Sequence, residues 1–339
     1  MWTSPNRPEA ALAAAGTREA AHAAAGARDA ALAAAGTRNA AHAEGVLRRL
    51  EWTVIRRLDG QLQGDFRTLF RGAGMDLADL REYQHHDDVR HIDWNVTARL
   101  DTPHVRQFTE SREIDAWFLL DLSASVDFGS GPSSKLDMAR DFTAVLARLL
   151  ARHGNRVGAT LYGAGVEATL PARGGRAQVL GLLHRIATRP PPARPHPTDL
   201  AELFRRADDA IRRRSLVFVV SDFQSLPGWH DALGRLAVRH EVVAVRVVDP
   251  LERELPDLGV VTIQDAETGE QLQVDTHDRG FRRRFAEAAA RRETALQEAF
   301  ARAGVDVLEL ATDDDLADAV LRFARLRRLR NRLGAGGAR

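Results

Sequence analysis

The sequence predicts a doubly wound α/β domain with a mostly parallel central sheet over residues 115–335. Its strand-sized segments, such as "AWFLL" and "LVFVV", are apolar throughout, which is typical of strands that are buried on both faces. The segments between them carry apolar residues at intervals of three and four, the pattern of amphipathic helices. Continuous apolar strands separated by such helices indicate a parallel sheet that is covered by helices on both sides.

The elements of this domain can be assigned in order along the chain. We expect the first strand at 116–123, followed by a helix over 134–154 that Gly154 closes. The segment 259–276 predicts a β-hairpin that turns about Thr268 and Gly269. The remaining strands are expected at 156–163, 166–171, 215–223, 241–249 and 306–312, and the remaining helices at 175–187, 198–214, 228–240, 281–304 and from Asp314 to about Arg332.

Two further regions precede this domain. Residues 1–45 form an alanine-rich, low-complexity tail, in which "ALAAAGTREA" begins a pattern that recurs every ten residues. That period does not return side chains to one helical face, and solenoid repeats are at least ~20 residues long, so we expect no packed repeat array. Residues 46–114 are dense in charge but contain scattered aromatic and aliphatic residues, which predicts a small, ordered, loop-rich segment.

The composition excludes several kinds of protein. The chain has 339 residues, a formal net charge of +1 and no cysteine, so disulfides, zinc–thiolate sites and a cysteine nucleophile are ruled out. The near-neutral charge gives no reason to expect a nucleic-acid partner. The longest apolar runs are far shorter than the ~20 residues of a membrane helix, and the N-terminus lacks a secretory signal pattern. We therefore expect a soluble, cytoplasmic protein without a membrane span.

The stretch "DLSAS" carries the clearest chemical signal. Asp121, Ser123 and Ser125 follow at intervals of two at the end of the first strand. Their side chains therefore project from one side while the chain stays extended, and they can converge where the chain turns. In a doubly wound sheet, ligands bind beyond the carboxyl ends of the strands. Oxygen ligands of this kind suit a hard cation such as Mg²⁺.

Two more oxygen-bearing residues fall at comparable places. Thr198 starts a predicted helix in "PTDL", and Asp222 follows an apolar strand in "VVSDF". Taken singly, Thr198, Asp222 and Asp121 each have an alternative role as a turn or helix cap. Taken together, in this order and on these elements, the oxygen-bearing side chains favour a metal site.

This pattern resembles the metal-ion-dependent adhesion site of von Willebrand factor type A domains, which reads Asp-x-Ser-x-Ser, Thr, Asp. The preceding segment, "FRGAGMDLADLREYQHHDDVRHIDWNVTARLDTPHVRQFTESREI", closely resembles the bacterial domain-of-unknown-function 58 family, whose members couple such a segment to a von Willebrand A-like half. The resemblance covers roughly residues 50–320. Many members carry N-terminal membrane helices, which are not found here, and a glycine usually precedes the paired aspartates where this chain has His86.

The resemblance implies a role for each residue. Ser123 and Ser125 would ligate Mg²⁺ or Mn²⁺ through their hydroxyls, and Thr198 would do so directly or through water. Asp121 and Asp222 would act largely through bound water. Because neutral hydroxyls leave the charge of the cation poorly neutralised, its open position would attract an Asp or Glu of a protein partner.

Similarity to the family also suggests a biological setting. It implies a non-enzymatic adaptor in the chaperone-like maturation of protein complexes, with a MoxR-type AAA+ ATPase among its partners. The alternative is a metal-dependent hydrolase, in which the cation would activate water. The sequence disfavours this alternative because no general base with a supporting partner is recognisable beside the predicted metal site.

A second cluster, rich in histidine and aspartate, lies within residues 46–114. It lacks a fixed metal-binding spacing such as HExxH, and nearby arginines offer ion-pair partners. We therefore interpret it as structural pairing or partner contact. The cluster consists of His85, His86, Asp87, Asp88, His91 and Asp93.

Overall fold

The computed structural model describes the predicted α/β domain and parts of the region before it. Most of the alanine-rich tail lies outside the described residues, as do all members of the histidine and aspartate cluster except Asp87, so these predictions stay open. The described residues are 44–45, 47–48, 50, 54–58, 76–84, 87, 92, 94–100, 102–109, 114–190 and 196–336.

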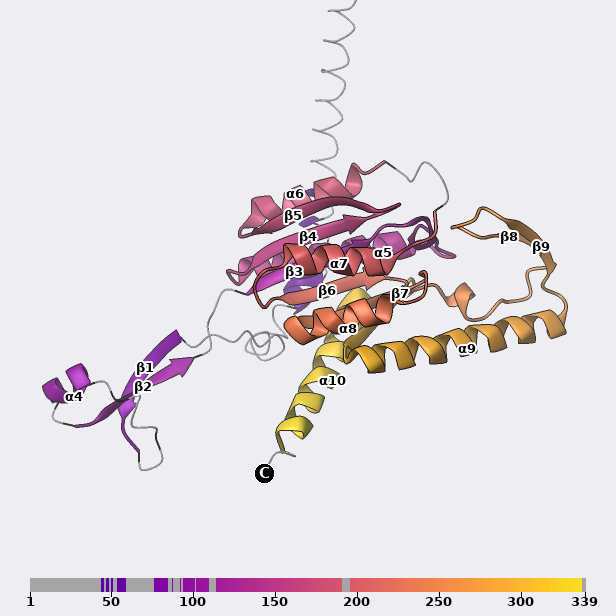
Figure 1. Ribbon diagram of the computed structural model, residues 1–339. Helices are drawn as coiled ribbons and strands as arrows, with labels where there is room; N and C mark the ends of the chain where they lie inside the picture. Colours follow the sequence, from indigo (N-terminus) through magenta and orange to yellow (C-terminus); the bar gives the residue numbers. More distant parts are fainter. Residues whose placement is uncertain are drawn as a thin grey trace, which may run out of the picture.

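A six-stranded sheet forms the centre of the domain, in the order β10-β7-β6-β3-β4-β5 (Figure 1). All neighbouring strands are parallel except the edge strand β5, which runs antiparallel to β4. The prediction of a doubly wound, mostly parallel sheet is therefore confirmed. The strands are β3 Asp115–Asp121, β4 Arg156–Tyr162, β5 Val166–Arg173, β6 Leu216–Ser221, β7 Glu241–Val248 and β10 Asp306–Ala311.

Helices cover both faces of this sheet. The apolar residues of α5, α6 and α10 pack on one face, and those of α7, α8 and α9 pack on the other. The helix predicted over 198–214 is shorter in the structure, because Ile211 is extended, with φ −91° and ψ 95°, and begins the connection to β6. The helices are α5 Lys135–Arg152, α6 Arg176–Ala187, α7 Leu200–Ala210, α8 Trp229–Arg239, α9 Arg279–Ala303 and α10 Leu316–Gly336.

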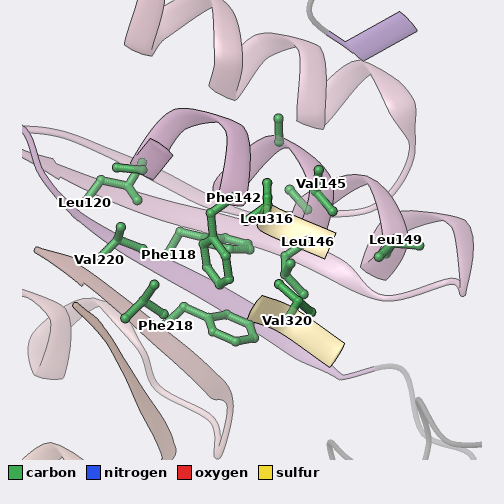
Figure 2. Packing of buried hydrophobic residues seen from close by; sticks show 14 of the residues in the cluster. Phe118, Leu120, Phe142, Val145, Leu146, Leu149, Phe218, Val220, Leu316 and Val320 are labelled. Carbon is green, nitrogen blue, oxygen red and sulfur yellow. The ribbon is translucent and has the colours of Figure 1, made fainter. Parts of the chain in front are cut away.

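Alternate residues of β3 and β6 point to opposite faces and build two apolar layers. Toward α5, Phe118 stacks on Phe218 with ring centroids 5.2 Å apart, and Phe142 meets Phe218 edge-on at 5.9 Å (Figure 2). Toward α7 and α8, Leu119 and Val219 belong to the second layer. Burying one such side chain stabilises the fold by about 1.5–3 kcal/mol. Packing on both faces therefore fixes the positions at which β3 and β6 end.

The topology creates a switch point at β3. The chain passes from β3 through α5 to β4 on one side, and later returns through α7 to β6 on the other side. Ligands of doubly wound sheets bind at such points, beyond the carboxyl ends of the strands. Asp121 is the last residue of β3, so the predicted metal site begins at the switch point.

Two small hairpins accompany the domain. β8 Val260–Gln264 and β9 Gln271–Asp275 pair in antiparallel fashion, which confirms the hairpin predicted over 259–276. β1 Asp76–Glu82 pairs with β2 His104–Thr109 beside the short helix α4 Trp94–Leu100. Figure 1 shows this second hairpin to one side of the central sheet.

The region before the sheet also contributes to the core. Leu47, Leu50, Ile55 and Leu58 are buried in the same apolar layer as α5 and α10. The beginning of the predicted segment 46–114 therefore packs on the α/β domain. Within the described ranges, no helix is both long and apolar enough to cross a membrane.

Candidate metal centre

The "DLSAS" stretch turns sharply after β3. Asp121 is fully buried, and one of its carboxylate oxygens accepts a hydrogen bond from the Ser123 amide at 3.0 Å. The chain then enters the 3-10 turn η3 Ala124–Val126. The hydroxyl oxygens of Ser123 and Ser125 come to 3.2 Å from each other. The structure thus brings together the side chains whose spacing predicted that they would converge.

The end of the neighbouring strand β6 completes the acidic part of the site. Ser221 donates its hydroxyl hydrogen to the second carboxylate oxygen of Asp121 at 2.6 Å, so the two strand ends are tied together. Asp222 follows directly, is buried, and accepts a hydrogen bond from the Gln224 amide at 3.0 Å. Ser221 is a member of this site that the motif alone does not reveal.

Thr198 lies just before α7 and is tied to the segment that follows β6. Its carbonyl accepts hydrogen bonds from the Leu226 amide at 2.8 Å and the Ser225 hydroxyl at 2.9 Å, both in the segment after β6. Its side chain is fully buried, and the hydroxyl finds no hydrogen-bond partner among the described residues. The N-cap of α7 is Asp199, which accepts from the Glu202 amide at 3.2 Å. Capping therefore does not explain Thr198.

Burial makes the Asp121 carboxylate costly to ionise. Loss of solvation, and next the negative charge of Asp222, raise the pKa of Asp121 to about 6, although hydrogen bonds from Ser221 and Ser123 act in the opposite direction. A cation beside both carboxylates would favour their ionised forms. The electrostatics of the site therefore suit a positive charge.

A buried lysine already supplies one positive charge beside the site. Lys135 opens α5, and its ammonium group donates to Asp222 at 2.7 Å and to Glu252 at 2.6 Å; Glu252 belongs to the 3-10 turn η4 Pro250–Glu252. Burial acts to lower the pKa of Lys135, but these two carboxylates outweigh burial and raise it. One signal for Lys135 was present in the sequence, because it is the single lysine of the chain.

A partly buried arginine holds the backbone of the same turn. Arg189 donates to the Leu122 carbonyl, and its guanidinium also forms two hydrogen bonds with Glu167, at 2.7 and 2.9 Å. The Leu122 amide donates to the Tyr162 carbonyl at 2.8 Å. Both backbone polar groups of Leu122 are therefore held from outside the motif, which orients the residues on either side of it.

The available donor atoms fit Mg²⁺ or Mn²⁺. The hydroxyls of Ser123, Ser125 and Thr198 are oxygen ligands, as are the carboxylates of Asp121 and Asp222, and such ligands suit these ions. A buried hydroxyl without a hydrogen-bond partner costs about 1–3 kcal/mol. In the part of the chain that is described, the Thr198 hydroxyl is in this state, and a cation ligand would explain it.

A second aspartate at a strand end is built differently. Asp249 follows β7 and is fully buried. One of its oxygens accepts from the Ser130 hydroxyl at 2.7 Å and the Leu251 amide at 3.0 Å; the other accepts from the Ser130 amide and the Thr312 hydroxyl, both at 2.8 Å. Burial acts to raise the pKa of Asp249, but these hydrogen bonds outweigh it and lower the pKa. This carboxylate is saturated by protein donors.

Comparisons with known proteins place the chain in a family. The family described as "Protein of unknown function DUF58" matches residues 79–295. The chain is 39% identical over 282 residues to the uncharacterized proteins Rv1480 of Mycobacterium tuberculosis and Mb1516 of Mycobacterium bovis, and the alignments cover 83% of this chain and 89% of each relative.

Solved structures with a similar arrangement include BatB from Bacteroides thetaiotaomicron, with 15% identity and a TM-score of 0.42. An aerotolerance-related membrane protein from Bacteroides fragilis has 13% identity and a TM-score of 0.43. Both superpositions cover 63% of this chain and 98% of the other chain. On the strength of the family match and of the two mycobacterial relatives, the chain belongs to the DUF58 family.

Proposed function

We propose that the protein is a non-enzymatic binding module that uses Mg²⁺ or Mn²⁺ to grip a carboxylate of a protein partner. Ser123, Ser125 and Thr198 would hold the ion through their hydroxyls. Asp121 and Asp222 would act largely through bound water. The ion would supply an open position that attracts an Asp or Glu side chain, because hydroxyl ligands neutralise little of its charge.

The state of the hydroxyl groups carries this proposal. Ser123 and Ser125 face each other with their oxygens 3.2 Å apart, and the Thr198 hydroxyl is buried without a partner in the described ranges. At Asp249, by contrast, the hydroxyls of Ser130 and Thr312 donate to the carboxylate. Hydroxyl oxygens that are held close together with free lone pairs are suitable ligands for a hard cation.

The family resemblance supports the choice of partner. We propose that a MoxR-type AAA+ ATPase is among the partners, and that the protein is an adaptor in the chaperone-like maturation of protein complexes. An ATP-dependent partner requires ATP, so this proposal places the protein in the cytoplasm.

Titration calorimetry with Mg²⁺ and Mn²⁺ tests the metal-binding step. The double variant Ser123→Ala/Ser125→Ala should bind either ion at least about 100-fold more weakly, because it loses two ligand oxygens. Ser133→Ala, in the loop that precedes α5, is the matched control and should bind like the wild type. Circular dichroism should show the same fold in all three proteins, since Ser123 and Ser125 lie beyond the strand. Unchanged metal affinity in the double variant would contradict the proposal, and so would an unfolded double variant.

A pull-down tests the partner step. A purified MoxR-type ATPase from the same genome should bind the protein in Mg²⁺, and binding should be lost in EDTA or with the double variant. Equal binding in Mg²⁺ and EDTA would contradict a metal-dependent contact. Turnover of a generic ester or phosphate substrate that disappears in Asp121→Ala would instead support the metal-dependent hydrolase.

A further inference from the structure

The β8–β9 hairpin brings a carboxylate of the chain itself to the candidate metal centre. Glu267, in the turn between the two strands, accepts a hydrogen bond at 3.3 Å from the amide of Thr198, 69 residues away in the sequence. The buried hydroxyl of Thr198 lacks a partner within the described parts of the structure, as does that of Thr160 in β4. Figure 1 shows the hairpin at the same end of the domain as the loop that follows β3.

The hairpin turn is built to present Glu267 in a fixed direction. The Asp265 side chain accepts hydrogen bonds from the Glu267 and Thr268 amides, both at 2.8 Å. The Asp265 backbone also pairs with the Glu270 carbonyl and the Gly269 amide, each at 2.8 Å. Gly269 has a φ of 76°, which glycine adopts without the steric cost of a side chain. These contacts hold the turn, so the Glu267 carboxylate reaches Thr198 from an ordered support.

The rest of the hairpin is anchored at its base. The Thr276 hydroxyl accepts from the Leu258 amide at 2.8 Å and donates to the Gly259 carbonyl at 2.7 Å. Nearer the tip, Ile263 and Leu272 lie opposite each other and are 36% and 63% exposed. The outer part of the hairpin is therefore not buried in the core, and its tip could leave the site without unpacking the domain.

We propose that Glu267 is this chain's own carboxylate ligand for the ion held at Ser123, Ser125 and Thr198. This inference rests on the proposed function, since Glu267 would occupy the position that a partner's Asp or Glu takes. A carboxylate on a tethered hairpin has a high effective concentration at the site. A partner would have to displace Glu267 from the ion. The hairpin would therefore lower the apparent affinity for every acidic partner, and only partners with further contacts would bind.

Relaxation of water protons by Mn²⁺ tests this proposal on the full chain. Bound Mn²⁺ speeds relaxation in proportion to the number of water molecules that it coordinates. Glu267→Gln should bind Mn²⁺ roughly tenfold more weakly, because a charged ligand is lost. It should also show stronger relaxation per bound ion, because water replaces the carboxylate. The amide of glutamine can still accept the Thr198 hydrogen bond, so a merely structural contact would leave both readouts unchanged.

Two comparisons separate the outcomes. Glu270→Gln, which removes a carboxylate from the same turn, should match the wild type in affinity and relaxation. If Glu267→Gln also matches the wild type while Ser123→Ala/Ser125→Ala loses Mn²⁺, the proposal for Glu267 is overturned and the proposed function stands. If the wild-type protein does not bind Mn²⁺ at all, both are overturned.

Discussion

Asp121 ends β3 and Asp249 follows β7, two strands of one sheet that are separated by β6, yet the two aspartates use the same chemical groups in different ways. Both carboxylates are fully buried beside serine or threonine hydroxyls. At Asp249 the hydroxyls of Ser130 and Thr312 donate to the carboxylate, and hydrogen bonds lower its pKa in spite of burial. At Asp121, burial and then the charge of Asp222 raise the pKa to about 6.

The difference teaches what distinguishes a structural aspartate from a candidate metal ligand. An aspartate beside hydroxyls is not sufficient, since both strand ends have that composition. The number of hydrogen bonds to the carboxylate decides. Asp249 accepts four, so its site is complete without a cation, whereas Asp121 accepts one from the Ser221 hydroxyl and one from the Ser123 amide. At the end of β3 the hydroxyl oxygens of Ser123 and Ser125 face each other, and the site gains from an added positive charge.

Removing Lys135 should have the largest effect on the stability of the candidate metal centre, because its ammonium already neutralises Asp222. In EDTA, Lys135→Met should lower the free energy of unfolding by about 3–5 kcal/mol, since Asp222 and Glu252 are left without their buried cation. Saturating Mg²⁺ should restore more stability to this variant than it adds to the wild type, because an ion bound at the site would take over part of the neutralisation.

Urea unfolding with and without Mg²⁺ measures both effects. Arg140→Met, which removes partly exposed ion pairs with Asp137 and Asp141 in the same helix, is the control and should cost less than about 1 kcal/mol. A small loss in Lys135→Met, with the same Mg²⁺ effect as in the wild type, would show that Lys135 and the metal do not share Asp222.

Asp249→Asn tests whether Asp249 is a structural aspartate that contributes to stability and not to metal binding. It replaces a charged acceptor of four hydrogen bonds, and we expect a loss of about 2–4 kcal/mol at neutral pH with unchanged Mn²⁺ affinity. Because the folded-state pKa of Asp249 lies below its ordinary value, ionised Asp249 stabilises the fold above about pH 4, and this contribution is lost as the pH falls through the lowered pKa.

The pH dependence of unfolding checks the sign of this prediction. The difference in unfolding free energy between the wild type and Asp249→Asn should be constant from pH 7 to pH 5 and should shrink below about pH 4. A difference that grows toward low pH would mean that the hydrogen bonds do not favour the charged carboxylate.

The sequence predicts the positions of β3 and β6 well, for a physical reason. Strands buried on two faces must be apolar throughout, as in "AWFLL" and "LVFVV", and the helices that cover them must carry an apolar stripe. These local patterns locate Asp121 and Asp222 at the ends of strands. The convergence of Ser123 and Ser125 also follows from local spacing, since one turn after the strand is enough to bring their hydroxyls together.

The groups that complete the site could not be predicted in this way, because each comes from a distant part of the chain. Ser221 is separated from Asp121 by 100 residues, and Lys135 from Asp222 by 87. Arg189 binds Leu122 across 67 residues, as Glu267 binds Thr198 across 69. Periodicity reports which face of an element is buried, but contacts between polar side chains depend on how the elements pack, which no local pattern encodes.

The smallest expected effect is also the most direct test of the comparison, because the same Thr→Val substitution can be made beside Asp249 and in the candidate metal centre. Thr312→Val removes a hydroxyl that donates to Asp249 at 2.8 Å, and it should cost about 1.5–3 kcal/mol of unfolding free energy, the usual range for a hydrogen bond to a charged group. Thr198→Val removes a buried hydroxyl that has no partner in the residues described, so it should leave stability in EDTA unchanged or raise it by up to about 1 kcal/mol. Mn²⁺ affinity should respond in the opposite sense, falling about tenfold in Thr198→Val and staying constant in Thr312→Val. Equal stability losses in the two variants would mean that the Thr198 hydroxyl is engaged in the protein alone, and the distinction between the two strand ends would then fail.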